Sequence, residues 1–279
     1  MRTDKRTSTL RRALVTGASS GIGAAFARRL GAEGYDIILV ARRRDRLQAL
    51  AQEIEGISSA RVEVIAADLA EPHDLRRVEE RVAKEEALEL LVNCAGFGVN
   101  SRFQQTDPAV LEAMVRLHVV APLRLTHAAL PGMLARNHGS IINVASVAAF
   151  LADPGSIWNT YAATKSCLLT FTVGLYEDVR ATGVQIQALC PGWTRTEILE
   201  AGGRAWDVPE AYTMQPEQVV EASLDGLRRG ELVCCPSLRD DTLLRELSRV
   251  KDAVFNQANT TGTLAIRYRP TPSGDDAAS

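Results

Sequence analysis

The stretch Thr16-Gly17-Ala18-Ser19-Ser20-Gly21-Ile22-Gly23 follows a short apolar run, 13–16, and leads directly into a helical pattern. Glycine lets the backbone approach a pyrophosphate, and the N–H groups and dipole of a helix start stabilise its charge. The spacing is G-x-x-x-G-x-G rather than G-x-G-x-x-G, and a plain tight turn would use similar residues. Because the glycines stand between a strand and a helix, the stretch predicts phosphate contacts from Gly17, Ser19, Ser20, Gly21, Ile22 and Gly23.

Short apolar runs alternate with longer helical patterns along almost the whole chain. The expected strands are 13–16, 37–41, 62–66, 90–93, 140–144, 184–189 and 232–235. The expected helices lie near 21–31, 45–54, 72–86, 108–136, 160–181 and 216–229, with one more within 238–256 that packs outside or meets a partner. This alternation requires right-handed crossovers, so we predict an α/β fold: a parallel sheet with helices on both faces.

The alternation indicates one large domain, residues 12–256, in a chain of 279 residues that is 46% hydrophobic. Residues 1–11 hold a basic cluster, for which we expect a flexible tail; a targeting or interaction arm is the alternative. Residues 257–279 end in a small polar segment with two prolines, Pro270 and Pro272. We expect a flexible tail there as well.

The composition argues against nucleic acid, a membrane or a metal as a partner of this chain. The formal net charge is −2 and the pI is near 6.1, so no general field favours nucleic acid. No apolar run approaches the ~18 residues needed to span a bilayer, which argues against a membrane protein. The five cysteines include no CxxC and no histidine at metal-ligand spacing, so we expect small core residues and no metal. Free thiols fit a reducing compartment, and we expect a cytoplasmic protein.

Ligands of an open parallel sheet bind beyond the carboxyl ends of its strands. After the second strand the chain reads Ala41-Arg42-Arg43-Arg44, where an NAD enzyme usually has a carboxylate for the ribose diol. Guanidinium groups from Arg42 and Arg43 favour a 2′-phosphate, which predicts NADP(H) as the cofactor. The alternative is a solvated helix start, with Asp45 and Arg46 as further surface charges.

The other strand ends carry small or polar side chains. Asp68, next to Leu69, is placed to accept a hydrogen bond from an adenine amino group. The small residues of 93–96 would let the nucleotide lie against the backbone, and Ser146 follows the fifth strand. We predict further cofactor contacts from Asp68, Leu69, Asn93, Ala95, Gly96, Pro191, Gly192, Thr194 and Thr196.

Tyr161 and Lys165 stand four residues apart at a helix start, so both side chains lie on one helix face. A free tyrosine has a pKa near ~10. A partly desolvated ammonium beside it, helped by a bound cationic ring, would lower that pKa toward the range useful for general acid catalysis. We expect this pair to move a proton during the reaction.

The chain resembles the short-chain dehydrogenase/reductase family over about residues 12–236, in Thr16 to Gly23, Asn93 to Gly96, Ser146, Tyr161-x-x-x-Lys165 and Pro191-Gly192. The resemblance implies a Rossmann-type, doubly wound sheet of seven parallel strands and NAD(P)-dependent oxidoreduction. It implies that Tyr161 gives or takes the hydroxyl proton and that Ser146 orients the substrate oxygen. It further implies that Lys165 binds the nicotinamide ribose and lowers the tyrosine pKa. The arginine run also resembles the NADP-preferring members.

One position departs from the family pattern. The stretch 117–122 matches a segment in which the family usually has an asparagine that bends the helix and holds a water of the proton relay, and here the residue is His118. The histidine could bond that water, or titrate near neutral pH itself. The third reading is a buried histidine whose nitrogens are satisfied by the backbone.

All three tryptophans, Trp158, Trp193 and Trp206, fall in the segments that follow strands rather than in strands. Together with the apolar loop 197–215 they predict a roomy apolar or aromatic substrate pocket under a lid. The alternative is that these rings only pack on the scaffold.

We expect an enzyme that interconverts a ketone or aldehyde and an alcohol with NADP(H). One alternative is a non-redox isomerase, dehydratase or cyclase that uses Tyr161 as an acid, which His118 keeps open. The other is a non-catalytic NADP(H)-binding regulatory protein, against which the complete Ser146, Tyr161 and Lys165 set argues. We expect a homodimer joined through 108–136 and 160–181, with a homotetramer as the alternative, because the C-terminal extension would cover the edge that tetramers use.

Overall fold

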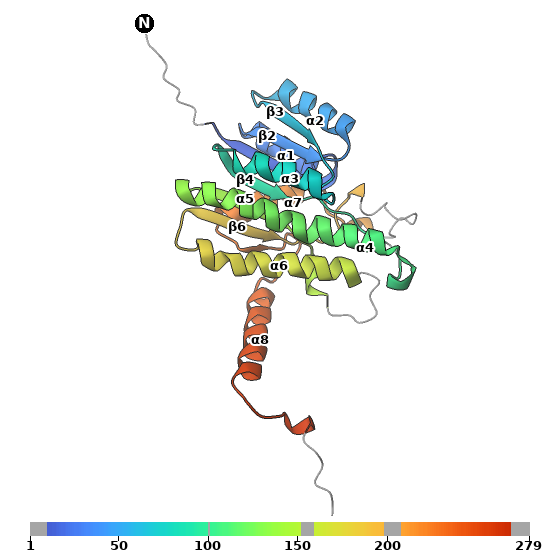
Figure 1. Cartoon of the computed structure of the whole chain (residues 1–279), viewed down its shortest axis with the longest axis vertical. Helices are drawn as coiled ribbons and strands as arrows, with labels where there is room; N and C mark the ends of the chain where they lie inside the picture. The colour runs from blue at the N-terminus through green and yellow to red at the C-terminus, as the bar shows by residue number, and fades with distance from the viewer. Residues whose placement is uncertain (1–9, 100, 152–158, 198–207, 269–279) are drawn as a thin grey trace, which may run out of the picture. The chain divides into compact units, whose positions relative to one another are not determined.

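The computed structural model describes residues 10–99, 101–151, 159–197 and 208–268. They include a seven-stranded parallel sheet with the order β3-β2-β1-β4-β5-β6-β7 (Figure 1). The strands are β1 Arg12–Thr16, β2 Asp36–Ala41, β3 Val62–Ala66, β4 Leu88–Asn93, β5 Gly139–Val144, β6 Val184–Leu189 and β7 Val233–Cys234. The predicted doubly wound α/β fold with seven parallel strands is confirmed.

The strands are joined by helices on both faces of the sheet. They are α1 Gly21–Ala32, α2 Arg44–Ile57, α3 Pro72–Ala83, α4 Pro108–Val115, α5 Ala121–Arg136, α6 Asn159–Val179 and α7 Pro216–Arg228. The helix predicted over 108–136 is not continuous, because a π-helical segment, Arg116–Val120, separates α4 from α5. Pro122 explains the break: it has no N–H for the carbonyl of His118 four residues earlier, and its ring crowds that carbonyl.

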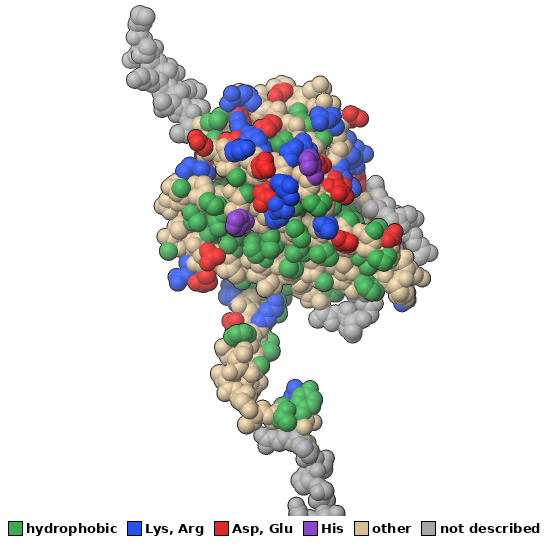
Figure 2. Space-filling view, in the orientation of Figure 1, with side chains coloured by type: hydrophobic (Ala, Val, Ile, Leu, Met, Phe, Trp, Pro, Cys, Tyr) green, Lys and Arg blue, Asp and Glu red, His purple; other side chains and the backbone are tan. Residues whose placement is uncertain are grey.

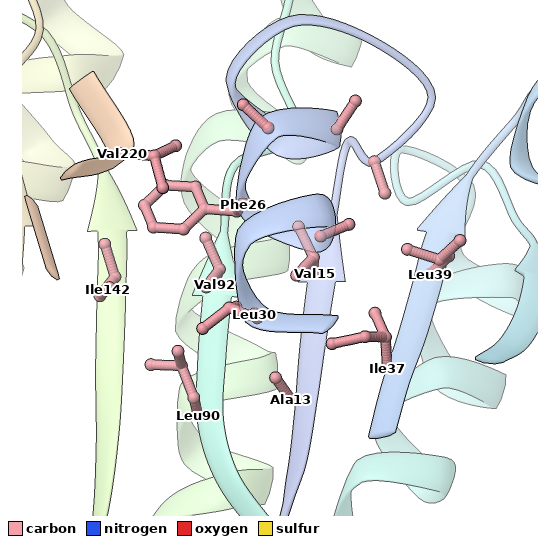
Figure 3. Close-up of a cluster of buried hydrophobic side chains, with 14 of the residues drawn as sticks. Ala13, Val15, Phe26, Leu30, Ile37, Leu39, Leu90, Val92, Ile142 and Val220 are labelled. Carbon is pink, nitrogen blue, oxygen red and sulfur yellow. The ribbon is translucent and has the colours of Figure 1, made fainter. Parts of the chain in front are cut away.

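Side chains alternate between the two faces of each strand and so feed two cores. Val15 packs on one face with Phe26 and Leu30 of α1 and with residues of α2 and α7 (Figure 3). Leu14 points to the other face and packs with α3 and α5, for example against Leu125. Phe26 and Leu125 are fully buried, and burial of each such side chain contributes roughly 1.5–3 kcal/mol.

The strand order creates the crevice in which a site can form. β1 pairs with β2 on one side and with β4 on the other, so the chain reverses its direction of winding at β1. The loops that follow β1 and β4 therefore leave the sheet toward opposite faces, and a space opens between them at the carboxyl ends.

Two compact units divide the chain, residues 1–237 with the sheet and residues 238–279. The second unit contains α8 Thr242–Asn259, the helix predicted within 238–256, and the short 3₁₀ turn η6 Ile266–Tyr268. Among the described helices, none combines the length and the apolar character that crossing a bilayer requires.

The expectation that every cysteine is a core residue is wrong for Cys167, which is exposed on α6. Val173 and Tyr176 of the same helix are also exposed. The apolar sequence of α6 extends around the whole helix, so the apolar neighbours of Cys167 in the sequence did not reveal which side faces the sheet.

Candidate active site

The turn after β1 needs its glycines. Gly17 and Gly21 have φ values of +68° and +55°, where glycine is favoured. A Cβ on Gly23 would lie 2.4 Å from the Gly17 carbonyl oxygen, so only glycine lets α1 start this close to the strand. The first N–H groups of α1 consequently lie at the carboxyl end of β1, an arrangement suited to an anion.

Thr16 ties this turn to the end of β4, a role that the sequence analysis missed. Its Oγ1 accepts hydrogen bonds from the N–H groups of Cys94 at 2.9 Å and Ala95 at 3.0 Å. The same hydroxyl donates to the Val92 carbonyl oxygen at 3.3 Å. A threonine placed last in a buried strand, opposite a small-residue loop, was the signal available in the sequence.

A groove of about 530 Å³ runs along these strand ends. Asn93 does not line it: this side chain is buried and donates to Asn143 Oδ1 at 2.8 Å. Trp158 and Trp206 lie outside the described residues. The groove is lined by the other residues predicted for cofactor or substrate: Gly17, Ser19, Ser20, Gly21, Ile22, Gly23, Arg42, Arg43, Asp68, Leu69, Ala95, Gly96, Ser146, Tyr161, Lys165, Pro191, Gly192, Trp193, Thr194 and Thr196.

One end of the groove carries exposed arginines. Arg43 Nη2 donates to the hydroxyls of Ser19 and Ser20, both at 2.8 Å, and Nη1 donates to Glu197 at 2.7 Å. Arg46 pairs with the same carboxylate. Although burial opposes it, hydrogen bonds from these two arginines hold the pKa of Glu197 below its usual value. Glu197 also lines the groove and was missed, although it directly follows the predicted Thr196.

The other end of the groove contains a buried cation. Lys165 is 4% exposed, and its Nζ donates to the Val144 carbonyl oxygen at 2.8 Å. The same nitrogen lies 5.7 Å from the centre of the Tyr161 ring. The hydroxyls of Tyr161 and Ser146 are hydrogen-bonded to each other. The structure thus brings together the three side chains that the sequence analysis grouped.

Desolvation dominates the protonation equilibria here. Burial raises the pKa of Tyr161 to about 12, against the opposing hydrogen bond with Ser146. Burial also lowers the pKa of Lys165 to about 8. Desolvation is the largest cause of the Tyr161 shift, and the expectation that Lys165 together with a bound cationic ring lowers the tyrosine pKa stays a prediction.

His118 is fully buried, and both of its ring nitrogens have partners. Nε2 accepts the Phe97 N–H at 3.0 Å, so the ring proton is on Nδ1, which lies 3.0 Å from Thr164 Oγ1. That hydroxyl in turn donates to the Tyr161 carbonyl oxygen at 2.8 Å. Burial, then the charge of Lys165, hold the pKa of His118 well below its usual value. Of the three readings, the satisfied buried histidine fits, with Thr164 as the partner besides backbone, and titration near neutral pH does not.

The family model described as short chain dehydrogenase matches residues 11–205, which include the turn after β1 and the Ser146, Tyr161 and Lys165 set. The chain belongs to the short-chain dehydrogenase family. It is therefore an oxidoreductase of this family.

Two proteins of known structure are similar over nearly the whole chain, and a sequence relative is similar over most of it. One from Sphingobium yanoikuyae, solved in complex with NADPH, is 35% identical with a TM-score of 0.87, covering 93% of this chain and 100% of that chain. A bulky-bulky ketone specific alcohol dehydrogenase from Comamonas testosteroni is 32% identical with a TM-score of 0.85, covering 94% and 100%. An uncharacterised oxidoreductase of Staphylococcus saprophyticus is 32% identical over 218 residues, 78% of this chain and 91% of the relative.

In this short-chain dehydrogenase the groove has an apolar rim beside the tyrosine. Val147, Leu151 and Trp193 line the groove and are 42%, 43% and 39% exposed. Phe97 and Leu117 add further apolar surface. Apolar side chains left this accessible around a few polar groups are typical of a pocket for an apolar ligand.

Proposed function

We propose that the protein interconverts a ketone or aldehyde and an alcohol, with NADP(H) as the hydride carrier. The observation that carries the proposal is the hydrogen-bonded pair of Ser146 and Tyr161 hydroxyls, beside the buried Lys165, at the inner end of the groove. A carbonyl oxygen gains negative charge as it is reduced, and two converging hydroxyls stabilise that charge in the transition state.

The residues present fit NADP(H). The Gly17 to Gly23 turn offers backbone N–H groups without side chains in the way, and would hold the pyrophosphate. Arg42 and Arg43 would hold the 2′-phosphate, and Lys165 has N–H donors beyond its bond to Val144 for a ribose hydroxyl. When bound, NADPH supplies the hydride. The NADPH complex of the Sphingobium relative supports this assignment.

Side chains of the protein would supply the proton that the reduced carbonyl oxygen takes up. Tyr161, with a pKa of about 12, stays protonated at neutral pH and can donate to the nascent alkoxide. Lys165, with a pKa of about 8, remains mostly charged at pH 7 and adds positive potential near that oxygen. Ser146 orients the substrate oxygen, and His118 fixes the Phe97 loop and the Tyr161 backbone without exchanging a proton itself.

For the substrate we propose a ketone with two bulky apolar substituents. Val147, Leu151 and Trp193 form the accessible apolar rim against which such groups would pack. The Comamonas relative, named as specific for bulky-bulky ketones, supports this choice.

The geometry of His118 removes the reason for considering a non-redox reaction. Such a reaction needed a second titratable group beside Tyr161, and this histidine is neutral with both nitrogens bonded. We therefore propose the redox reaction alone.

Single-turnover absorbance at 340 nm would test the proposal, with stoichiometric NADPH and a series of ketones of increasing bulk. The expected result is stoichiometric loss of NADPH with formation of the alcohol. Conversion of a substrate while NADPH persists would overturn the proposal in favour of non-redox chemistry. NADPH binding without any conversion across the series would favour a regulatory protein.

We further propose a homodimer joined through the outer face of α4, α5 and α6. Figure 2 shows hydrophobic side chains gathered over these helices, and the exposed ones are Val110, Val115, Val120, Leu134, Val173 and Tyr176. Surfaces of this kind mark association sites. Size-exclusion chromatography with light scattering is expected to give twice the mass of one chain, and Val173→Glu is expected to shift it toward one chain; four chains would support the tetramer instead.

A further inference from the structure

Helix α8 has an apolar stripe that its own unit does not cover. Leu243, Leu247, Val250 and Val254 recur at intervals of four, three and four residues, the spacing of the a and d positions of a coiled coil. Val250 is 50% exposed and Val254 is 64% exposed. No described residue from 238 to 268 is buried.

A helix with this surface needs a partner. α8 has 18 residues and is therefore about 27 Å long. In proteins most of the stability of a helix comes from packing its amphipathic face rather than from the helix itself. The stripe is long enough to pack along one other helix.

We propose that α8 pairs in parallel with α8 of a second copy of this chain, as a short coiled coil. With Leu247 at an a position and Val250 at a d position, Glu246 falls at g and Lys251 at e. In a parallel pair each g position faces the e position five residues further along the other helix. Glu246 therefore faces Lys251 of the second copy, and two-fold symmetry repeats the attraction.

The charges disfavour other arrangements. In an antiparallel pair g faces g and e faces e, so the attraction between Glu246 and Lys251 is lost. A membrane-surface helix would have a polar face dominated by basic residues. On α8 the basic Arg245, Arg249 and Lys251 are interspersed with the acidic Glu246 and Asp252.

A coil of this length is weak by itself, so its pairing rests on the proposed homodimer. Two copies joined through α4, α5 and α6 would hold their α8 helices at an effective concentration that reaches the millimolar range for short connections. The coil then adds a second contact between the same two copies, and the two contacts can be tested separately.

Disulfide trapping in the full-length chain tests the pairing. Leu247→Cys places a thiol at an a position, where parallel helices bring identical residues together, and Ser248→Cys is the matched control one residue away on the outer side. Mild oxidation is expected to link two Leu247→Cys chains at least roughly tenfold faster than two Ser248→Cys chains. Mass spectrometry would identify the cross-linked peptide and show that the bond joins the two introduced thiols. Equal rates for the two variants would overturn the proposal.

Charge exchange in the Leu247→Cys background gives a second readout. Glu246→Lys and Lys251→Glu should each slow the trapping by roughly two- to fivefold, because like charges then face each other. The double variant restores the attraction and should restore the rate. Slow trapping in the double variant would overturn the parallel register and indicate that α8 packs elsewhere. Light scattering on Val173→Glu shows separately whether the contact through α4, α5 and α6 exists, and circular dichroism checks folding.

Discussion

The two ends of the groove hold cationic side chains in opposite environments. The side chain of Arg42 is 68% exposed, and its Nη1 lies 3.7 Å from Asp68 Oδ2. Lys165, at the other end, is 4% exposed and bonded to a backbone carbonyl. Water screens charge at the first end, whereas removal from water changes pKa values at the second.

Because of this difference, we expect the arginine end to affect which cofactor binds and the tyrosine end to affect the reaction itself. Each contact of an exposed guanidinium contributes little to stability or binding, and added salt weakens it. The buried end acts as a coupled unit in which Tyr161, Lys165 and His118 are held by hydrogen bonds and desolvation. Substitutions should therefore have graded effects at the arginine end and large effects at the tyrosine end.

The largest effect is expected for Tyr161→Phe, which removes the proposed proton donor while keeping the ring. Ketone reduction should lose roughly 10³-fold in kcat, because general acid catalysis contributes about 10²–10⁴-fold. NADPH affinity should change little. The control is Tyr176→Phe, an exposed tyrosine on the same helix, and stopped-flow NADPH oxidation is the measurement. Equal activity of the two variants would refute the role of Tyr161.

Lys165→Met should lower the activity of the enzyme and raise its stability. We expect roughly 10²-fold lower kcat/KM together with about 1–3 kcal/mol higher unfolding free energy at pH 7, because the charged amine is buried at a cost. The folded pKa of about 8 lies below the ordinary lysine value of 10.5, so the unfolded chain binds more protons in this window. The stability of the native protein therefore rises from pH 8 to 10.5, and the advantage of the variant should shrink. Urea unfolding at about pH 7 and about pH 9.5 measures both values; a variant less stable at pH 7 would contradict the buried-charge account.

Arg43→Ala should weaken NADPH binding about tenfold and NADH binding less than twofold, since a hydrogen bond to a charged group contributes about 1.5–3 kcal/mol before screening. Arg44→Ala is the control, because Arg44 is exposed at the start of α2 and does not line the groove. Fluorescence titrations at low and high salt would measure the affinities. Equal loss for the two cofactors would remove Arg43 from the 2′-phosphate site.

His118→Asn introduces the residue that the family usually has at this position. We expect a change of only a few-fold in kcat and an unchanged pH profile: kcat/KM for reduction stays level through neutral pH, then falls as Lys165 loses its proton near pH 8. An acidic limb near the ordinary histidine pKa that the variant abolishes would show that the histidine titrates after all. Initial rates in a constant-ionic-strength buffer series would measure the profile.

The smallest effect is expected for Glu197→Gln. This carboxylate pairs with Arg43 and Arg46, and so competes with an incoming phosphate for the same guanidinium groups. Its neutral analogue should tighten NADPH binding by roughly two- to fivefold, in line with exposed ion pairs of about 0.2–1 kcal/mol, and leave NADH unaffected. Glu210→Gln, an exposed acid paired with Arg195, is the control. Weaker NADPH binding would mean that Glu197 positions the arginines rather than competing for them.

Sequence reasoning was most successful where one residue type is sterically required. Gly23 tolerates no side chain, and the i,i+4 spacing of Tyr161 and Lys165 fixes a shared helix face, so both features follow from the chain alone. It was weakest where burial decides. The pKa of Tyr161, the inward orientation of Asn93 and the two partners of His118 depend on which atoms pack around them, and no local pattern reports that packing.

The exposure of the arginine end affects how the cofactor preference of such a protein can evolve. Arg42 and Arg43 contribute no buried surface to either core, so replacing them need not unfold the chain or disturb Tyr161. If these arginines hold the 2′-phosphate as proposed, a lineage could change its preferred coenzyme by single surface substitutions without altering the buried end of the groove. The glycine turn leaves no such freedom, because each replacement there must first relieve a steric collision.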